Sequence, residues 1–537
     1  MSYTAHSDTF ARDNLPPRHQ WPEFLFEGPG LKYPARMNCA AELLDAAVRK
    51  GHGARTAIHA ADGRCSYAQL LAQANRLANV LVRHMGLKPG NRVLLRGPNN
   101  PMMAACWFAV IKAGGIVVPT MPLLRAKELT DIINKAQVTH ALCDKRLESE
   151  LVAALPACPT LQTIRYWYDD GQDALDVLAA AQPAGFRNVD TAADDVALIA
   201  FTSGTTGKPK GTMHFHRDVI AMCDCFPRSC LKPTKDDVFC GTPPIAFTFG
   251  LGGMLCFPLR FGASTVLIER LAPDSLLDTI SRFRATVCFT APTMFRAMAG
   301  IAKGYDLSSL KKCVSAGEAL PDATRQLFKG ATGVEIIDGI GSTEMIHIFI
   351  SHTPERVRRG ATGYAIPGYR ATVLDDEGRP CRPGAVGRLA VKGPTGCRYL
   401  ADERQANYVQ GGWNITGDAY SMDADGYFFY QARTDDMIIS AGYNIAGPEV
   451  EGALLGHAAV AECGVVGWPD EERGTIVKAF VVLKPGYARS EALAEELKEH
   501  VKRVIAPYKY PRAVEFLDAL PRTETGKLQR FKLRKVA

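Results

Sequence analysis

Residues 198–211 read Leu-Ile-Ala-Phe-Thr-Ser-Gly-Thr-Thr-Gly-Lys-Pro-Lys-Gly, and no other stretch of the chain is as informative. An apolar strand runs here into a loop rich in glycine and hydroxyl side chains. Glycine has no Cβ, so backbone N–H groups can converge on an anion. The loop therefore predicts a phosphate site, and its two lysines favour a nucleotide triphosphate. The residues expected to contact phosphate are Thr202, Ser203, Gly204, Thr205, Thr206, Gly207 and Lys208.

A Walker-type P-loop is the main rival interpretation of this loop. That motif has a glycine five residues before its Gly-Lys pair and a Ser or Thr directly after the lysine, which holds magnesium. Here Thr202 stands at the first position and Pro209 follows Lys208. Both requirements fail, so the loop is a phosphate site of another kind. A flexible polar surface turn is the remaining alternative.

The composition indicates a globular protein of at least two domains. The chain has 537 residues, 47% of them hydrophobic and 22% charged, too long for one compact core. No apolar run approaches the roughly 20 residues that cross a bilayer, and the polar N-terminus lacks a signal-peptide pattern. The fifteen cysteines are scattered through apolar segments, which suits buried thiols in a reducing compartment. We expect a cytoplasmic protein with no membrane partner.

The charge distribution favours a small anionic ligand over a nucleic acid. The formal net charge is +7, and basic and acidic residues are interleaved except near the C-terminus. There, basic side chains crowd together without the interleaved aromatic residues or motifs of nucleic-acid binders. The basic residues of this tail are Arg522, Lys527, Arg530, Lys532, Arg534 and Lys535.

Helical and strand patterns alternate along most of the chain. Residues 40–48 read as an amphipathic helix and residues 91–96 as a buried strand, and strand patterns recur at 263–268, 285–290 and 312–317. This alternation predicts an α/β fold of mostly parallel sheets flanked by helices, with ligands at the strand ends.

Beyond about residue 360, closely spaced turns between short strands indicate a small β-rich subdomain. The residues after about 434 predict a separate group of secondary-structure elements, with helices near 448–455 and 491–504 and a strand at 477–483. We therefore expect an N-terminal domain over residues 1–433 and a smaller, mobile α+β domain over 434–537.

Four further segments share the chain with the phosphate loop, among them 338–344 (Asp-Gly-Ile-Gly-Ser-Thr-Glu), 413–418 (Trp-Asn-Ile-Thr-Gly-Asp) and 521–528 (Pro-Arg-Thr-Glu-Thr-Gly-Lys-Leu). Together, and in this order, they resemble the adenylate-forming superfamily, which includes acyl-CoA and aryl-CoA ligases, peptide-synthetase adenylation domains and luciferases. The resemblance covers essentially the whole chain and implies ATP, Mg²⁺ and CoA as cofactor and co-substrates.

The resemblance implies roles for the second nucleotide motif. Thr343 would meet the α-phosphate and Glu344 would hold magnesium, an ion that needs few protein carboxylates when it sits on triphosphate. Gly339 and Ile340 would contact the nucleotide. Relatives commonly have an aromatic residue where Ile340 stands, so adenine would rest on apolar contact here.

The same resemblance assigns the remaining ATP and CoA contacts. Asp418 would accept hydrogen bonds from the ribose hydroxyls, with Arg433 nearby, and Asp435 would lie at the hinge. Lys527 would supply the catalytic ammonium, which can neutralise charge as pyrophosphate leaves. Gly442 and Tyr443 would face the pantetheine arm of CoA.

Two segments narrow the resemblance to the benzoate and 2-aminobenzoate CoA ligases, namely residues 247–252 (Phe-Thr-Phe-Gly-Leu-Gly) and 339–349 (Gly-Ile-Gly-Ser-Thr-Glu-Met-Ile-His-Ile-Phe). The implied acid pocket is compact and mostly apolar, which suits one flat ring. Thr248 or His347 could hydrogen-bond an ortho amino group, and packing roles are the alternative. The pocket residues are Phe247, Thr248, Phe249, Ala316, Gly341, His347 and Ile348.

Several alternatives stay open. The acid could be another aryl or small acyl acid, or the acceptor could be a carrier protein; a luciferase-like oxygenase would use the same adenylation residues. A nucleotide-sensing protein could keep the fold without turnover, although Lys527 and Glu344 favour an enzyme. His214 and His216 look like a metal pair on one strand face, but a structural role is favoured. The oligomeric state is open between monomer and homodimer.

Overall fold

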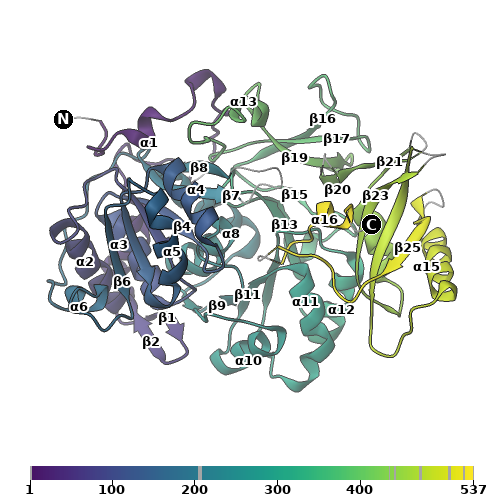
Figure 1. Ribbon diagram of the computed structural model, residues 1–537, viewed down its shortest axis with the longest axis horizontal. Helices are drawn as coiled ribbons and strands as arrows, with labels where there is room; N and C mark the ends of the chain where they lie inside the picture. Colours follow the sequence, from purple (N-terminus) through teal and green to yellow (C-terminus); the bar gives the residue numbers. More distant parts are fainter. Residues whose placement is uncertain are drawn as a thin grey trace.

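A computed structural model describes residues 3–28, 30–202, 209–433, 436–440, 443–470, 474–505, 509–523 and 526–535. Two large sheets with flanking helices and a smaller antiparallel sheet form the N-terminal part, and a small C-terminal part lies at one end of the molecule (Figure 1). The predicted α/β class, with a β-rich subdomain and a smaller α+β domain, is confirmed.

The first large sheet has six strands in the order β6-β5-β3-β4-β7-β8. Neighbouring strands run parallel except for β7 and β8, which are antiparallel. All five residues of β3 are buried, as predicted for residues 91–96. The strands are β3 Arg92–Arg96, β4 Ile116–Thr120, β5 His140–Asp144, β6 Thr163–Trp167, β7 Val196–Thr202 and β8 Lys210–Phe215.

The second large sheet has nine strands in the order β15-β14-β13-β12-β11-β9-β10-β1-β2. The six strands β13, β12, β11, β9, β10 and β1 are parallel, with antiparallel strands at both edges. The predicted strands near 265, 287 and 313 are β10, β11 and β12. The bounds are β1 Thr56–Ala60, β2 Gly63–Ser66, β9 Val238–Gly241, β10 Ser264–Val266, β11 Val287–Thr290, β12 Lys312–Ser315, β13 Ile336–Gly341, β14 Ile348–Ser351 and β15 Tyr364–Ala365.

Helices connect these strands, and their starts follow from local chemistry. The side chain of Asn100 accepts the Met103 N–H, and Pro101 occupies the first position of α3, where its missing N–H costs nothing. Residues 40–48 are helical as predicted, with π-type bonding at Ala41–Asp45. The α-helices of this part are α1 Phe10–Asp13, α2 Tyr67–Arg83, α3 Pro101–Lys112, α4 Ala126–Ala136, α5 Glu148–Ala154, α6 Leu175–Ala180, α7 His216–Phe226, α8 Thr248–Gly250, α9 Phe257–Arg260, α10 Pro273–Phe283, α11 Pro292–Ile301, α12 Asp322–Thr332 and α13 Gln405–Tyr408. No described helix is both long and apolar enough to cross a bilayer.

The β-rich subdomain is an antiparallel sheet in the order β16-β17-β19-β18, with β20 paired to β19. It occupies the top of the view in Figure 1, above the second large sheet. Its strands are β16 Arg370–Leu374, β17 Val386–Lys392, β18 Val409–Gln410, β19 Trp413–Met422 and β20 Phe428–Arg433.

The C-terminal part has a hydrophobic core of its own. Helix α15 begins where the Ser490 hydroxyl accepts the Leu493 N–H, and it buries Leu493, Leu497 and Val501 on one face. This separate core supports the proposed second domain, although the boundary residues 434–435 lie outside the described ranges. Its elements are β21 Ile438–Ser440, β22 Tyr443–Ile445, α14 Gly447–Leu455, β23 Val460–Asp470, β24 Gly474–Leu483, α15 Glu491–Val504, β25 Ala513–Phe516 and α16 Arg530–Leu533.

The cysteines are unpaired thiols, and all except Cys65 and Cys381 are buried. Burial raises the pKa of thiols such as Cys39 and Cys106, so they remain protonated and behave as small apolar side chains. The prediction of buried thiols is confirmed.

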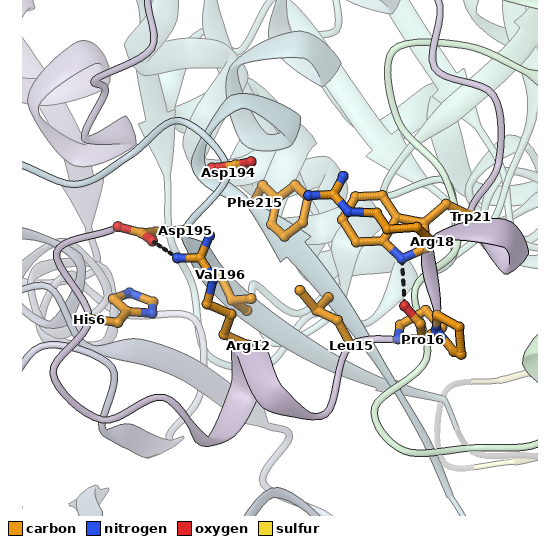
Figure 2. Close-up of a pocket in the computed structure, with 11 residues that line it drawn as sticks. His6, Arg12, Leu15, Pro16, Arg18, Trp21, Asp194, Asp195, Val196 and Phe215 are labelled. Carbon is orange, nitrogen blue, oxygen red and sulfur yellow. Dashed lines mark hydrogen bonds and ion pairs between the residues drawn. The ribbon is translucent and has the colours of Figure 1, made fainter. Parts of the chain in front are cut away.

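The N-terminal segment packs against the start of β7 and the end of β8, around a cavity of about 280 Å³ (Figure 2). Asp195 holds this N-terminal segment in place. Its carboxylate accepts hydrogen bonds from the Thr4 hydroxyl and the Ala5 N–H of the segment, and also from the N–H of Ala192. Arg12 lies 4.0 Å from the same carboxylate. The cavity is at the opposite end of β7 from the predicted phosphate loop. It is lined by His6, Arg12, Leu15, Pro16, Pro17, Arg18, Trp21, Asp194, Asp195, Val196 and Phe215.

Replacement of Asp195 should destabilise the protein in a pH-dependent way. Burial alone would raise the pKa of Asp195, but His6 and the hydrogen bonds from Thr4, Ala5 and Ala192 outweigh it and lower the pKa. The folded pKa thus lies below the unfolded value, so the stabilisation is present above the unfolded pKa and is lost as pH falls through the folded pKa. Asp195→Asn should cost about 1–3 kcal/mol at pH 7.

Urea unfolding between pH 3 and pH 7 measures this effect. Asp190→Asn is the control, because the Asp190 side chain is exposed and pairs with Arg36 at the surface; it should cost at most about 0.5 kcal/mol. A cost for Asp195→Asn that does not shrink on acidification would contradict the assignment.

Candidate active site

The predicted site residues gather where parallel strands end. Thr202 ends β7, Ala316 follows β12, and Gly341 ends β13. The carboxyl ends of parallel strands are where α/β proteins bind ligands. Residues 203–208 of the phosphate loop lie outside the described ranges. The two ends of that loop are adjacent, because Thr202 pairs with Lys210 across β7 and β8. Among described residues, the buried Thr202 hydroxyl has no hydrogen-bond partner.

The Glu344 carboxylate is buried just beyond β13 and is held by two groups from elsewhere in the fold. The Tyr399 hydroxyl donates to Glu344 Oε1 at 2.5 Å, and Lys210 Nζ lies 4.0 Å from that oxygen. Lys210 Nζ also donates to the Tyr399 hydroxyl at 3.1 Å. Burial, followed by the Glu344 charge, raises the pKa of Tyr399 far above its usual value. Tyr399 therefore stays protonated and remains a donor.

Residues 398–400 reach this position by pairing with β8. Met213 N donates to Arg398 O and Leu400 N donates to Gly211 O, both at 2.8 Å, so Tyr399 lies opposite Thr212. The Arg398 guanidinium also makes a fully buried ion pair with Asp218, at the start of α7. Backbone pairing thus brings Tyr399 beside β8, the strand that follows the phosphate loop.

The Glu344 carboxylate suits one magnesium ion that is already bound to phosphate oxygens. No group of three or more His, Cys, Asp or Glu residues in the described ranges could hold a metal ion. A single carboxylate is enough when phosphate oxygens and water complete the octahedron around magnesium. Glu344 therefore fits the predicted role.

His347 lies in an aromatic surround at the predicted acid pocket. Its ring centroid is 4.5 Å from that of Phe257, 5.7 Å from that of Phe249 and 5.9 Å from that of Phe226. Nε2 lies 3.4 Å from the Phe249 carbonyl oxygen, whereas Nδ1 is buried and has no partner among described residues. Burial lowers the pKa of His347 to about 3, so the imidazole is neutral at physiological pH.

Other predicted pocket residues lie around this histidine. Thr248 begins α8 next to Phe249 and is buried, and Phe247 immediately precedes the helix. A Cβ at Gly341 would lie 2.7 Å from the His347 carbonyl oxygen, so only glycine fits at this position. The side chains of Ala316, Ile340 and Ile348 belong to the same core cluster as Phe249.

Asp418 and Arg433 face each other across β19 and β20. Arg433 Nη1 donates to Asp418 Oδ1 at 3.0 Å and to the Thr416 carbonyl oxygen at 3.3 Å. Burial raises the pKa of Asp418, and the Arg433 charge opposes that rise. Asp418 thus lies in a strand rather than in a turn. Its carboxylate keeps acceptor capacity for a hydroxyl ligand.

Lys527 comes from the C-terminal part and lies against the segment that follows β12. Its Cε is 3.9 Å from the position that a Cβ would take at Gly317. The Lys527 loop is closed by a Thr523 N–H donated to the Lys527 carbonyl oxygen at 2.7 Å. Arg522 Nη1 lies 3.4 Å from Glu318 Oε1, in the same segment after β12. The structure therefore brings Lys527 to the edge where the other site residues gather.

Other predictions are corrected or stay untested. His216 is not on the strand with His214: β8 ends at Phe215, because the Asp218 carboxylate accepts the Phe215 N–H and helix α7 begins at His216. Asp435 and Gly442 lie outside the described residues. The backbone of Tyr443 begins β22. The roles assigned to the site residues stay predictions.

Models of known families match most of this chain. The AMP-binding enzyme model matches residues 44–399, and the model of the AMP-binding enzyme C-terminal domain matches residues 449–527. The chain belongs to the AMP-binding enzyme family. The two matched ranges lie on either side of residue 434, where we place the domain boundary.

Relatives in this family cover almost the whole chain. A benzoate–CoA ligase of Thauera aromatica is 36% identical over 513 residues, which is 94% of this chain and 97% of that protein. The crystal structure of the anthranilate CoA ligase AuaEII in complex with anthranoyl-AMP superposes with a TM-score of 0.90 at 34% identity and covers 94% of this chain and 98% of that one. A benzoate CoA ligase from Burkholderia xenovorans LB400 gives a TM-score of 0.84 at 32% identity, covering 93% and 100%.

The sequence did not reveal every residue of this family site. Tyr399 sits in a mixed polar and apolar stretch, 396–402 (Gly-Cys-Arg-Tyr-Leu-Ala-Asp), that matches no site motif, and its pairing with β8 brings it to Glu344. Ile346 has a φ of +65°, which is rare for a β-branched residue, and no sequence pattern indicates it.

Loss of the Tyr399 hydroxyl should destabilise the fold more than loss of a neighbouring tyrosine hydroxyl. Tyr399→Phe removes a hydrogen bond to a buried carboxylate, which is worth about 1.5–3 kcal/mol. Tyr408→Phe is the matched control, since its ring centroid is 5.7 Å away and its hydroxyl lies 3.3 Å from the Ser342 hydroxyl; it should cost about 0.5–1.5 kcal/mol. Equilibrium urea unfolding measures both, and equal costs would contradict the role given to Tyr399.

Proposed function

We propose that this protein is an AMP-forming acid–thiol ligase. It activates a small aromatic carboxylic acid of the 2-aminobenzoate or benzoate type with ATP and transfers the acyl group to CoA, releasing AMP and pyrophosphate. The observation that carries the proposal is the placement of Lys527 against Gly317, at the strand-end edge that also holds Glu344. A lysine from the C-terminal part therefore lies at the edge where the phosphate and acid sites are predicted.

The relatives support the same activity. Proteins named as benzoate–CoA ligase and anthranilate CoA ligase match at 36% and 34% identity along 94% of this chain. Anthranilate is 2-aminobenzoate, so both names describe one aromatic ring bearing a carboxylate. The aromatic side chains that surround His347 are consistent with a binding site for such an acid.

The first step joins the acid to AMP. A carboxylate oxygen attacks the α-phosphorus of ATP, the new P–O bond forms, and the bond to pyrophosphate breaks. Lys527 carries an ammonium that can approach both the carboxylate and the α-phosphate and neutralise the developing charge. Thr343 would contact the α-phosphate, and Glu344 would hold the Mg²⁺ that neutralises the phosphate oxygens. Asp418 would accept from the ribose hydroxyls.

The second step transfers the acyl group to sulfur. The CoA thiolate attacks the acyl carbon and AMP leaves, so no protein nucleophile is needed. Gly442 and Tyr443 would face the pantetheine arm after the C-terminal domain rotates about Asp435. Such a rotation would break the bonds that Arg296 of α11 donates to carbonyl groups of the C-terminal part. Those carbonyls belong to Leu455, Val460 and Ala461, at 3.2–3.3 Å.

Lys527→Ala should slow adenylate formation selectively. Loss of one positioned donor at a developing charge costs about 10²–10³ in rate. Transfer to CoA from a supplied aryl-adenylate should stay near the wild-type rate, because that half-reaction does not use Lys527. Lys532→Ala, an exposed basic residue of the same tail, should leave both half-reactions unchanged. Equal slowing of both half-reactions by Lys527→Ala would contradict its assigned role.

The pocket predicts how an ortho amino group is recognised. If Thr248 or His347 hydrogen-bonds that group, Thr248→Val or His347→Phe should lower kcat/KM for 2-aminobenzoate relative to benzoate by about 3- to 10-fold, the loss expected for one hydrogen bond. Thr248→Val is isosteric, and His347→Phe keeps a flat aromatic ring, though a slightly larger one. An unchanged ratio in both variants would assign the two residues to packing alone.

The direct test is product analysis with ATP, Mg²⁺, CoA and a panel of acids. The panel contains 2-aminobenzoate, benzoate, hydroxybenzoates, cinnamates and medium-chain fatty acids. The assay measures AMP and the thioester. A dominant 2-aminobenzoyl- or benzoyl-CoA product is expected. Adenylate without thioester would indicate another acceptor, such as a carrier protein. No AMP with any acid would favour a nucleotide-sensing protein. Cytoplasmic location and a monomeric or homodimeric state stay predictions.

A further inference from the structure

Two buried side chains hold the carbonyl groups of Thr343 and Met345, the residues on either side of Glu344. His214 Nε2 lies 2.8 Å from the Thr343 carbonyl oxygen, and the Thr395 hydroxyl donates to the Met345 carbonyl oxygen at 2.8 Å. Both His214 and Thr395 are fully buried. These donors lie outside the motifs that predicted the site.

The chemistry of His214 fixes the direction of its hydrogen bond. Burial, with the Arg398 charge, lowers the pKa of His214 to about 3, so its ring is neutral. A carbonyl oxygen only accepts, so the proton must be on Nε2. Nδ1 is then an acceptor; the nearest carboxylate oxygen, on Asp218, lies 3.9 Å away. His214 is therefore a neutral donor committed to the Thr343 carbonyl.

Thr395 is held in turn by a second hydroxyl. The Tyr369 hydroxyl lies 2.8 Å from Thr395 Oγ1. Because the single Thr395 proton goes to the Met345 carbonyl, Tyr369 must donate to Thr395. Burial raises the pKa of Tyr369 well above its usual value, which keeps that proton in place. The chain Tyr369–Thr395–Met345 thus has one consistent direction.

Residues 342–346 form the turn that these donors contact, and its backbone includes an energetically unfavourable conformation. Ile346 is buried with a φ of +65°, a region that β-branched residues rarely occupy. The Ile346 N–H donates to the Thr343 carbonyl at 3.2 Å, and Ser342 accepts the Met345 N–H at 3.2 Å. Unusual backbone conformations persist when the surroundings over-determine them.

We propose that His214 and Thr395 are positioning residues for adenylate formation. By fixing the carbonyl groups of Thr343 and Met345, they set the directions in which the side chains of Thr343 and Glu344 leave the turn. Small errors in such positions cost large factors in rate. The inference rests on the proposed function, because it assumes that Thr343 and Glu344 meet ATP.

The histidine two residues away provides a matched control. His216 is also fully buried, and burial lowers its pKa to about 3 as well. Its Nδ1 accepts the Cys39 N–H at 3.2 Å, so it does not touch the catalytic turn through that atom. Removing either imidazole disturbs a similar buried volume, but only His214 holds the Thr343 carbonyl.

The experiment compares His214→Phe and Thr395→Val, which remove the donors, with His214→Gln and Thr395→Ser, which keep them. His216→Phe is the control, and thermal unfolding identifies variants that are merely destabilised. The kcat/KM for ATP in adenylate formation should fall at least tenfold in His214→Phe and Thr395→Val. Most of that loss should be recovered in His214→Gln and Thr395→Ser. His216→Phe should stay within threefold of wild type.

Calorimetric titration with ATP separates failure of this inference from failure of the proposed function. If wild type makes AMP but His214→Phe equals wild type or equals His216→Phe, the positioning role is wrong. If wild type makes no AMP with any aryl acid, the proposed function has failed. In that case the affinities for ATP decide. An affinity that is tenfold weaker than wild type in His214→Phe and unchanged in His216→Phe supports the positioning role. Equal affinities overturn it.

Discussion

A carboxylate buried without partners is strongly unfavourable, and the site depends on satisfying this constraint at Glu344. Its two partners come from distant parts of the chain: Tyr399 supplies a hydroxyl and Lys210 a cation. Backbone pairing of residues 398–400 with β8 brings Tyr399 beside Lys210, which lies in β8 itself. β8 also supplies His214, and Thr395 lies three residues before Arg398, so neighbouring parts of two segments contact both the carboxylate and the turn that carries it.

The location of the site follows from strand direction. In the nine-stranded sheet, β11, β12 and β13 are parallel, so Thr290, Ala316 and Ser342 all lie at one edge. The C-terminal part has its own core yet places Lys527 at that edge. This placement suits the role proposed for Lys527, because the first step takes place at the α-phosphorus of ATP and the second at the acyl carbon, so the two steps need different groups.

Much of the fold could be predicted because its signals are local. The strand at 91–96 is continuously apolar between polar ends, and the helix at 491–504 carries its own apolar stripe and a Ser490 cap. Motif residues such as Glu344 and Lys527 stand out in the sequence for the same reason. The contacts of Tyr399 and Thr395 and the backbone of Ile346 depend on tertiary pairing or on a backbone angle, which no short pattern encodes. The predicted strand position of His216 is wrong because the Asp218 carboxylate accepts the Phe215 N–H and ends β8, a detail that the alternation of residues does not show.

The most direct test of the central claim is acid-dependent exchange of labelled pyrophosphate into ATP in the absence of CoA. The account requires an aryl-adenylate to form at one site before the thiol enters. It therefore predicts rapid exchange with 2-aminobenzoate or benzoate, and little without an acid. Thioester formation accompanied by no exchange until CoA is added would contradict an adenylate made independently of the thiol. Exchange that ignores the acid would contradict the acid site.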